Sequence, residues 1–348
     1  MKSCIRKSIM FICCIVGISC VLSGCGRKSI KVTATNTAMG TVVQYSLYVS
    51  DEKNGEVIIT ELQDELERLE KEYLSWRMVE SQVAKINQQA GQSEGTAVDE
   101  ALYEYLEQIW RVSKESDGAL DVTVGNVTAL WNLDEWSGRE KNQWQKFQVP
   151  GKVQIEALLK NTGFEKVKIG EGKIQMPQDM SLDLGAVGKG IACDRIGDYL
   201  KSQKGIQGAV ISVGGSVVTY GSKPDGSAWN VAIMHPREEG TYLGTLSLQG
   251  EWYIATSGDY ERYVEKEGKR YHHIMNPKTG YPADSGLCSV TILSDSGLLS
   301  DTLSTACFVL GKEDGLELAQ KMEVEALFVT TELKILMTDG MKKYFEES

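Results

Sequence analysis

Proline is scarce in this chain of 348 residues, and so is cysteine outside its first segment. The sequence has only 6 prolines, and five of its 8 cysteines lie within the first 25 residues, which leaves Cys193, Cys288 and Cys307. Three scattered thiols form neither a disulfide framework nor a CxxC metal pair. We expect them to be small core residues, because free cysteine is among the most buried residue types.

Clustered positive charge is also missing. The formal net charge is −11, and the body of the chain shows no dense group of Lys and Arg. Nucleic-acid affinity depends mainly on such groups, so we expect no nucleic-acid partner. The contents of 42% hydrophobic and 24% charged residues are those of an ordinary folded protein, and the length allows one large domain or two smaller ones.

The first apolar run is too short to cross a membrane as a helix. It covers residues 9–22 without a charge and follows three basic residues, as in the core of a signal peptide. The run ends in LSGC at 22–25, which resembles the bacterial lipobox. We predict a signal peptide over 1–24, a lipidated Cys25, and an anchor and tether over 25–35 on the extracytoplasmic face of a bacterial cell membrane. The alternative is a soluble protein whose signal peptide happens to end in a free cysteine.

The remainder shows helix and strand patterns without a dividing linker. Apolar residues at helical spacing predict helices over 57–73, 99–116, 185–203 and 300–310. Runs rich in β-branched residues predict a strand pair over 31–49 and strands over 208–215, 229–234, 253–258 and 287–293, with a hairpin tip at 265–270. The combination predicts one α+β domain over 36–345 whose sheets are at least partly antiparallel.

A glycine-bearing segment, GAVGKG at 185–190, follows a short apolar run and precedes a predicted helix. Backbone N–H groups at such a helix start can bind a phosphate. The glycine spacing matches neither a Walker loop nor a GxGxxG motif. On these residues alone a tight strand-to-helix turn is the favoured interpretation, and a phosphate site is the second.

Asp301 and Thr305 are four residues apart in a predicted helix, so a carboxylate and a hydroxyl lie on one face. Mg²⁺ prefers such oxygen ligands and keeps waters and substrate phosphates in its other positions. Judged on these two residues alone, a structural role is the favoured interpretation. In it Asp301 caps or solvates the first helical turn and Thr305 bonds back to a backbone carbonyl.

Histidine occurs three times, and His272 and His273 are adjacent. On a strand they would point to opposite faces, so one of them can face a site. A neutral imidazole is a suitable acceptor for a hydroxyl proton near pH 7, although a lone histidine is more often structural. The NPKTG segment that follows, at 276–280, predicts a turn.

Seven segments, each weak alone, together resemble the FAD:protein FMN transferases of the ApbE type. Their order and spacing agree with that family from about residue 32 to 340. The segments are AMGT (38–41), SWRMVESQVAKIN (75–87), DGALDVTVG (117–125), DLGAVGKG (183–190), ISVGG (211–215), HIMNPKTGYP (273–282) and DTLSTACFVLG (301–311).

The resemblance implies a Mg²⁺-dependent enzyme with an α+β fold of the T-fold type. Such an enzyme splits the pyrophosphate of FAD, releases AMP and attaches FMN through a phosphoester to a Thr or Ser of a partner. Partners in the family include subunits of membrane redox complexes and extracellular flavoproteins. Members are frequently lipoproteins, which agrees with the prediction for Cys25.

The resemblance also assigns residues. Asp301, Thr305 and the carbonyl of Ala186 are implied as metal ligands, and Asp183 is expected to orient its loop or reach the substrate, with a buried structural carboxylate as the alternative. His273 is our candidate for the base that takes the acceptor proton. The residues implied as flavin or adenine contacts are Met39, Trp76, Ala119, Leu120, Asp121, Lys189 and Ile274.

Some of these positions depart from the family pattern. Relatives can have Thr at the position of Ala186 and Glu at the position of Lys189, so only backbone contacts carry over there. Trp76 lies where a Tyr often stacks, and it keeps an aromatic face while changing the hydrogen bonding.

Two other functions remain open from the sequence. An FAD pyrophosphatase would release FMN and AMP with water as the nucleophile, and a non-catalytic flavin-binding lipoprotein would hold FAD unchanged. Analysis of the products with and without a Thr-bearing acceptor distinguishes the three.

Overall fold

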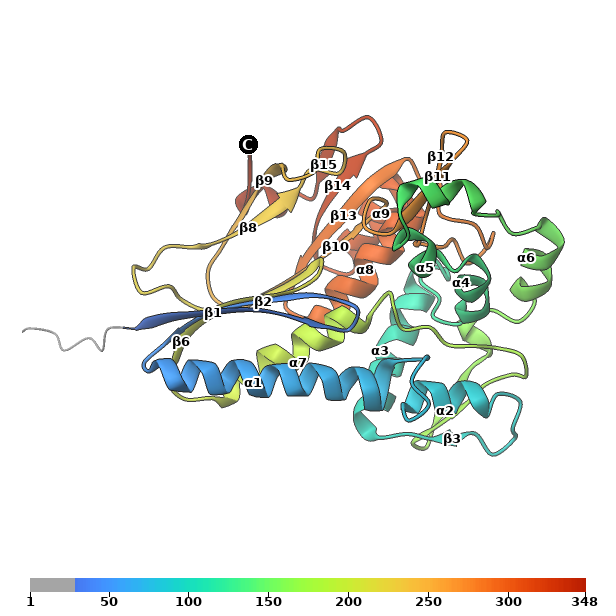
Figure 1. Cartoon of the computed structure of the whole chain (residues 1–348), viewed down its shortest axis with the longest axis horizontal. Helices are drawn as coiled ribbons and strands as arrows, with labels where there is room; N and C mark the ends of the chain where they lie inside the picture. The colour runs from blue at the N-terminus through green and yellow to red at the C-terminus, as the bar shows by residue number, and fades with distance from the viewer. Residues whose placement is uncertain (1–28) are drawn as a thin grey trace, which may run out of the picture.

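The computed structural model describes residues 29–348 (Figure 1). The predicted signal peptide and Cys25 lie outside the described residues. Strand β1 (Ile30–Ala38) occupies most of the segment predicted as a tether, and β16 (Phe345–Glu347) ends beyond residue 345. The folded part of the chain therefore extends beyond the predicted limits of 36–345 at both ends, because Lys31, Thr33 and Thr35 of the predicted tether lie on the exposed side of β1. The first residues of the predicted tether, 25–28, lie outside the described residues.

An eight-stranded sheet forms the centre of the fold, with every ladder antiparallel. The strand pair predicted over 31–49 is confirmed as β1 and β2, and the other predicted strands of this sheet are confirmed as β6, β10 and β13. In spatial order the strands are β1, β2 (Thr41–Val49), β6 (Ile206–Val213), β7 (Ser216–Gly221), β10 (Trp252–Gly258), β13 (Leu287–Ser294), β14 (Glu325–Thr330) and β15 (Ile335–Met337).

Helices cover one face of this sheet and form the largest apolar core with it (Figure 1). The helices predicted over 57–73 and 99–116 are confirmed, whereas α7 begins three residues later than predicted and α8 three residues earlier. The covering helices are α1 (Glu52–Arg68), its π-helical continuation (Leu69–Leu74), α3 (Glu100–Glu115), α7 (Gly188–Ser202), α8 (Gly297–Leu310) and α9 (Lys312–Lys321).

A three-stranded antiparallel sheet covers the opposite face, in the order β16, β9 (Tyr242–Leu248), β8 (Trp229–Met234). Its inner residues, such as Trp229 and Leu246, pack against Ile254 and Leu327 of the large sheet. The molecule thus has three layers, namely helices, large sheet and small sheet. The predicted α+β class with antiparallel sheets is confirmed.

A third cluster, rich in aromatic side chains, lies at the end of the large sheet marked by α4, α5 and α6 (Figure 1). There Trp131 donates from Nε1 to the carbonyl of Gly280 at 2.7 Å. Glu267 and Gly268 have φ of 53° and 76°, which confirms the predicted hairpin tip. The elements are α4 (Gly125–Trp131), α5 (Leu133–Ser137), a 3₁₀ turn (Lys141–Lys146), α6 (Lys152–Leu159), β11 (Tyr263–Lys266) and β12 (Lys269–His272).

The remaining elements are short. They are α2 (Gln82–Gln88), the small antiparallel sheet of β3 (Thr96–Ala97), β5 (Lys173–Gln175) and β4 (Lys168–Gly170), and the 3₁₀ turns Phe164–Lys166 and Met341–Lys343. Cys193, Cys288 and Cys307 are buried and unbridged, which confirms their predicted place in the core. No helix within residues 29–348 has the length and apolarity needed to cross a membrane.

Candidate active site

One cleft of about 230 Å³ collects all the described residues predicted for the site. It lies where the turn between β1 and β2, the start of α7, the second turn of α8 and the segment after β12 meet. The sequence predicted which residues come together, while their individual roles remain predictions. The predicted residues that line the cleft are Met39, Trp76, Ala119, Leu120, Asp121, Asp183, Ala186, Lys189, His273, Ile274, Asp301 and Thr305.

The wall formed by α7 and α8 depends on two facing glycines. A Cβ atom on Gly190 would lie 2.3 Å from the carbonyl oxygen of Gly297, and a Cβ on Gly297 would lie 2.3 Å from the carbonyl oxygen of Gly190. Contacts this short do not occur, so only glycine permits the two helices to approach this closely. The approach brings Asp301 against the start of α7.

Each of the two helices supplies the carboxylate that caps the other. Asp301 of α8 accepts the backbone N–H of Gly190 at 2.7 Å. Asp194 of α7 accepts the N–H groups of Gly297 at 2.5 Å and Leu298 at 2.8 Å. Both carboxylates therefore lie at the positive end of a helix dipole. The structural alternative for Asp301 is wrong in its detail, because this carboxylate caps α7 rather than its own first turn.

The glycine segment forms a strand-to-helix turn. The N–H groups of Val187 and Gly188 both donate to the carbonyl of Leu184, at 3.1 and 2.9 Å. The N–H of Gly190 is taken by Asp301. The favoured interpretation as a tight turn is confirmed, and these three backbone N–H groups are already engaged within the protein.

The oxygen atoms on this wall suit a hard cation. The Asp301 side chain is buried, which raises the pKa of its carboxyl, while the Lys189 charge and the Gly190 N–H act in the opposite direction. The Thr305 hydroxyl lies 3.2 Å from the Ser257 hydroxyl rather than on a backbone carbonyl. With the Ala186 carbonyl they offer one charged and two neutral oxygen ligands, a set that Mg²⁺ accepts.

The described residues contain no metal site made only of His, Cys, Asp and Glu side chains. Among residues 29–348 no three His, Cys, Asp or Glu side chains are grouped to hold a metal. The predicted ligand set is of a different kind, because it contains a single carboxylate, and it stays a prediction. A magnesium ion there would complete its shell with waters and substrate phosphates.

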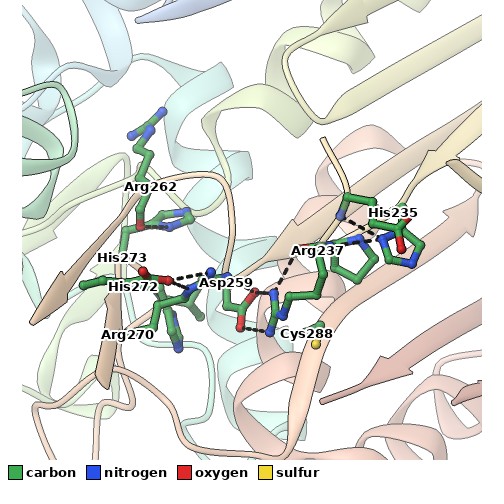
Figure 2. A network of polar contacts seen from close by, with 12 residues as sticks. His235, Arg237, Asp259, Arg262, Arg270, His272, His273 and Cys288 are labelled. Atoms are coloured by element: carbon green, nitrogen blue, oxygen red, sulfur yellow. Dashed lines mark hydrogen bonds and ion pairs between the residues drawn. The ribbon is translucent and has the colours of Figure 1, made fainter. Parts of the chain in front are cut away.

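His273 and His272 have different surroundings, and only His273 lines the cleft. Nδ1 of His273 lies 3.3 Å from the carbonyl oxygen of Arg262 (Figure 2), which accepts hydrogen bonds only. Nδ1 therefore holds the proton in this contact, which leaves Nε2 as the acceptor nitrogen of the neutral ring. Burial, with the charges of Arg262 and Lys189, lowers the pKa of His273 to about 3. His272 is buried, with Nε2 2.9 Å from the carbonyl of Ala283.

Two carboxylates predicted for the site hold the backbone in place. Asp183 accepts the N–H of Gly185 and the hydroxyl of Thr128, both at 2.8 Å, as expected for a residue that orients its loop. Asp121 accepts the N–H and hydroxyl of Thr123 at 2.7 and 2.6 Å. The Asp-x-Thr and Asp-x-Gly patterns are those of side chains that bond to the backbone two residues on.

Met39 occupies the turn between β1 and β2. Its φ of 53° is in the left-handed region, and Gly40 follows with φ 68°. The N–H of Met39 donates to a carboxylate oxygen of Glu70 at 3.0 Å. A residue other than glycine in this conformation stores strain, which is most common at functional sites.

The rim of the cleft contains three charged residues that the sequence did not indicate. Asp134 pairs with Arg77 at 2.7 Å through one carboxylate oxygen and with Arg262 at 2.9 Å through the other. The guanidinium of Arg77 also lies 4.2 Å from the centre of the Trp76 ring. Asp134 is 57 positions from Arg77 and 128 positions from Arg262 in the chain, so no local pattern links these residues.

Comparisons with known proteins agree with this fold and cleft. Residues 39–328 match the ApbE family, and the chain belongs to this family. It is 30% identical over 336 residues to the FAD:protein FMN transferase of Vibrio cholerae, covering 94% of each chain. It is 33% identical to a FAD:protein FMN transferase of Klebsiella pneumoniae, covering 88% of this chain and 92% of the relative.

Solved structures show the same fold. The ApbE protein of Thermotoga maritima superimposes with a TM-score of 0.80 at 30% identity, covering 91% of this chain and 100% of that one. The apo form of the Pseudomonas stutzeri flavinyl transferase ApbE superimposes with a TM-score of 0.78 at 30% identity, covering 92% of this chain and 98% of that one. The family predicted from the seven motifs is thus confirmed.

Proposed function

We propose that this chain transfers FMN from FAD to a Thr or Ser hydroxyl of a partner flavoprotein, with Mg²⁺ as cofactor and AMP as the second product. Its relatives bear the name of this activity. The observation that carries the proposal is the cleft in which a buried carboxylate, a lysine and a neutral imidazole converge. A pyrophosphate, which carries two negative charges, matches a site of this composition.

Charge neutralisation is the main requirement of phosphoryl transfer. Asp301, Thr305 and the Ala186 carbonyl would hold Mg²⁺, which when bound neutralises the non-bridging oxygens and the departing phosphate. Lys189, in the first turn of α7, adds a positive charge on the same wall. The buried glycine contact behind this wall holds these groups in fixed positions, so little reorganisation accompanies the reaction.

His273 would act on the acceptor. The hydroxyl oxygen forms a bond to the phosphorus of the FMN half while the bond from that phosphorus to the bridging oxygen breaks. AMP leaves with that oxygen and the electron pair, and the hydroxyl proton passes to Nε2 of His273. The Arg262 carbonyl supports this role, because it keeps the proton of the neutral ring on Nδ1.

Binding of the dinucleotide requires the rim to open. A volume of about 230 Å³ is below the roughly 300–1,000 Å³ of pockets that enclose a ligand of moderate size. The exposed ion pairs of Asp134 with Arg77 and Arg262 are weak enough to separate when FAD enters. Trp76, which faces Arg77, then offers its aromatic face to the flavin or adenine ring.

A location at the membrane is part of the proposal. The LSGC segment at 22–25 supports cleavage before Cys25 and lipidation of its thiol. The short distance from Cys25 to the start of β1 at Ile30 would keep the enzyme close to the lipid surface. Acceptors exposed on the extracytoplasmic face would then be within reach.

The test is a product analysis with a matched pair of variants. The protein is incubated with FAD, Mg²⁺ and an acceptor flavoprotein, and the assay measures flavin fluorescence on the denatured acceptor together with released AMP. Asp301→Asn is expected to abolish both products, and chelation of the metal to do the same. Asp198→Asn is the matched control, because it removes an exposed carboxylate of α7, and it is expected to form both products.

Two results would contradict the transferase. Release of FMN and AMP without labelling of any acceptor indicates a pyrophosphatase. FAD that stays intact in the presence of Mg²⁺ and acceptor indicates a flavin-binding protein.

A further inference from the structure

A second cavity, of about 410 Å³, adjoins the cleft. It lies between β8 of the small sheet and the face of the large sheet that carries Val217 and Ile254. Its volume is within the range of ligand sites, and no part of the proposed FAD chemistry uses it. The residues that line both cavities are Lys189, Thr256, Glu261 and Arg262. Whatever fills the second cavity therefore touches the residues beside the FAD cleft.

The second cavity runs along the open edge of β8. Side chains alternate between the two faces of a strand, and those of β8 are alternately buried and exposed. Val231 and Ile233 from the buried face line the cavity, and so do Ala232 and Met234 from the exposed face. A cavity that contacts both faces of a strand lies beside its edge rather than over one face.

The backbone groups on that edge can be assigned from the register. In β9 the N–H of Ser247 donates to the backbone carbonyl of Tyr344. The carbonyl of Leu243 accepts the backbone N–H of Ser348. Ser247 and Leu243 therefore direct their backbone groups toward β16. Antiparallel ladders alternate, so the intervening β9 residues bond to their partners in β8, which include Trp229 and Val231. The remaining β8 residues direct their backbone groups outward, as Asn230 and Ala232 do. Among residues 29–348 no hydrogen bond to the backbone of these two residues is formed on that edge.

This edge lacks the features that normally prevent strand addition. Exposed edge strands are usually protected by charged residues or proline. The β8 residues whose backbone groups point outward before the register shift at Ile233 and Met234 are Asn230 and Ala232, and neither is charged. The opposite edge of the same sheet, β16, carries Glu346 and Glu347. An uncharged edge beside a cavity is a site for an added strand.

The end of β8 nearest the cleft is fixed in place. Arg237, three residues after β8, pairs with the buried carboxylate of Asp259 through both guanidinium nitrogens at 2.7 Å (Figure 2). Asp259 precedes Glu261 and Arg262, which line both cavities. The bidentate pair thus holds the strand edge and the cleft in one arrangement, as a template for an incoming chain requires.

Given the FMN transfer proposed above, on which this depends, we infer that the acceptor protein binds by adding an extended segment to the outer edge of β8. Main-chain hydrogen bonds to Asn230 and Ala232 supply the register. Val217, Val231 and Ile254 receive the apolar side chains that point inward. The segment ends at Lys189 and Arg262, where its Thr or Ser hydroxyl reaches the FAD phosphorus.

The first test examines the backbone of the acceptor. Peptides of about nine residues around the modified Thr of an acceptor flavoprotein are synthesised with a single N-methyl group at each position in turn. Methylation removes one N–H and blocks the pairing edge, so FMN transfer to the peptide is expected to fall at least about 10-fold at every second position. The intervening positions are expected to change less than about 2-fold. A uniform effect, or none, would overturn the added strand.

The second test examines the enzyme with the whole acceptor protein, so it decides the question even where peptides are not substrates. Ala232→Pro removes the outward N–H, and the KM for the acceptor is expected to rise at least about 10-fold while the Kd for FAD is unchanged. Ala232→Thr keeps the N–H and is the matched control, with a KM close to that of the original protein.

The other outcomes separate the possible errors. If the original protein labels no acceptor at all, the proposed function is wrong. If it labels the acceptor and Ala232→Pro does so with an unchanged KM, only the strand addition is wrong. If light scattering shows a dimer that Ala232→Pro converts to monomer, the edge binds a second copy of this chain instead. If Ala232→Pro fails to fold, the N-methyl series decides.

Discussion

The two walls of the cleft are built by different means. On one wall α7 and α8 meet through Gly190 and Gly297, and the capping carboxylate Asp301 is only 2% exposed. On the other wall the side chains of Arg77, Asp134 and Arg262 are 55%, 40% and 37% exposed. The first wall holds charged groups in fixed positions, and the second is held by contacts that water weakens.

The difference matches the two requirements of the proposed reaction. Stabilising a pyrophosphate needs charges that do not move, and buried capping bonds with close packing supply this. Admitting a dinucleotide needs a rim that opens, and exposed ion pairs are each worth only about 0.2–1 kcal/mol. The cleft therefore combines a rigid wall for chemistry with a separable wall for entry.

The largest expected effect concerns His273, which is attached to the separable wall through Arg262. His273→Ala is expected to reduce FMN transfer by about 10²- to 10⁴-fold, the usual contribution of a general base. A base works deprotonated, and the pKa of about 3 keeps this ring neutral above that pH. The pH profile of kcat/KM, which reports the free enzyme, is thus expected to show no imidazole limb near pH 6.5.

The control for this prediction is His235→Asn in the loop after β8, which keeps an acceptor for the N–H of Glu238 and is expected to leave transfer unchanged. Full activity of His273→Ala would remove this residue from the mechanism. A limb near pH 6.5 that disappears in the variant would show that the ring titrates in the ordinary range.

A change on the rigid wall is expected to act first on stability. Gly297→Ala places a Cβ 2.3 Å from the Gly190 carbonyl, so α7 and α8 must move apart. Overpacking of this kind costs about 1–3 kcal/mol and sometimes more, measurable as a lower midpoint in denaturant unfolding. Gly170→Ala is the control, because nothing lies within 4 Å of the added atom. Equal midpoints for the two variants would show that the helices are not in tight contact.

The capping carboxylate of the same wall gives a dependence on pH. Burial raises the pKa of Asp194 to about 6, against 3.8 for an ordinary aspartate. A carboxyl whose pKa is higher in the folded than in the unfolded protein makes its full contribution to stability when the pH is below its pKa in the unfolded chain. This contribution is lost as the pH rises through its pKa in the folded protein. The free energy of unfolding, relative to Asp194→Asn, is therefore expected to fall by up to about 3 kcal/mol between pH 4 and pH 7. A difference that stays constant over this range would contradict the shift.

The sequence predicts best what is encoded within a few residues. The helix predicted over 99–116 agrees with α3, because Asp99 flanks its start and Gly118, with φ 73°, follows its end. The glycine turn at 185–190 is a similar case. Its helix begins only at Gly188, since Val187 with φ −135° is still outside it.

What the sequence alone does not reveal depends on contacts across the chain. Asp301 caps α7 at Gly190, more than a hundred residues earlier in the chain, and no local pattern indicates this contact. The resemblance to the family placed Asp301 in the site but did not predict its hydrogen bond to Gly190. Arg77 lies next to Trp76 in the SWRMVESQVAKIN motif without a role assigned to it, and Arg262 lies in none of the seven motifs. Only the folded chain brings the two arginines to Asp134. The β8 edge is also invisible in sequence, because it depends on which strands remain unpaired.

The smallest expected effect concerns the rim. Asp134→Asn removes both exposed ion pairs, and the free energy of unfolding is expected to change by less than about 1 kcal/mol. The rate of FAD association, followed by flavin fluorescence in stopped flow, is expected to rise up to about 5-fold because the rim opens more easily. Asp198→Asn, which removes a charge outside the cleft, is expected to leave this rate nearly unchanged.

Two causes of a faster association can be separated. Asp134→Asn also leaves two guanidinium groups uncompensated, and these attract an anionic dinucleotide. Arg77→Gln breaks one ion pair and removes a positive charge, so it opens the rim without adding attraction. Faster association in both variants indicates that opening of the rim limits entry. Acceleration in Asp134→Asn alone, abolished by salt, would show that the rim does not act as a barrier and that the two walls differ in charge rather than in mobility.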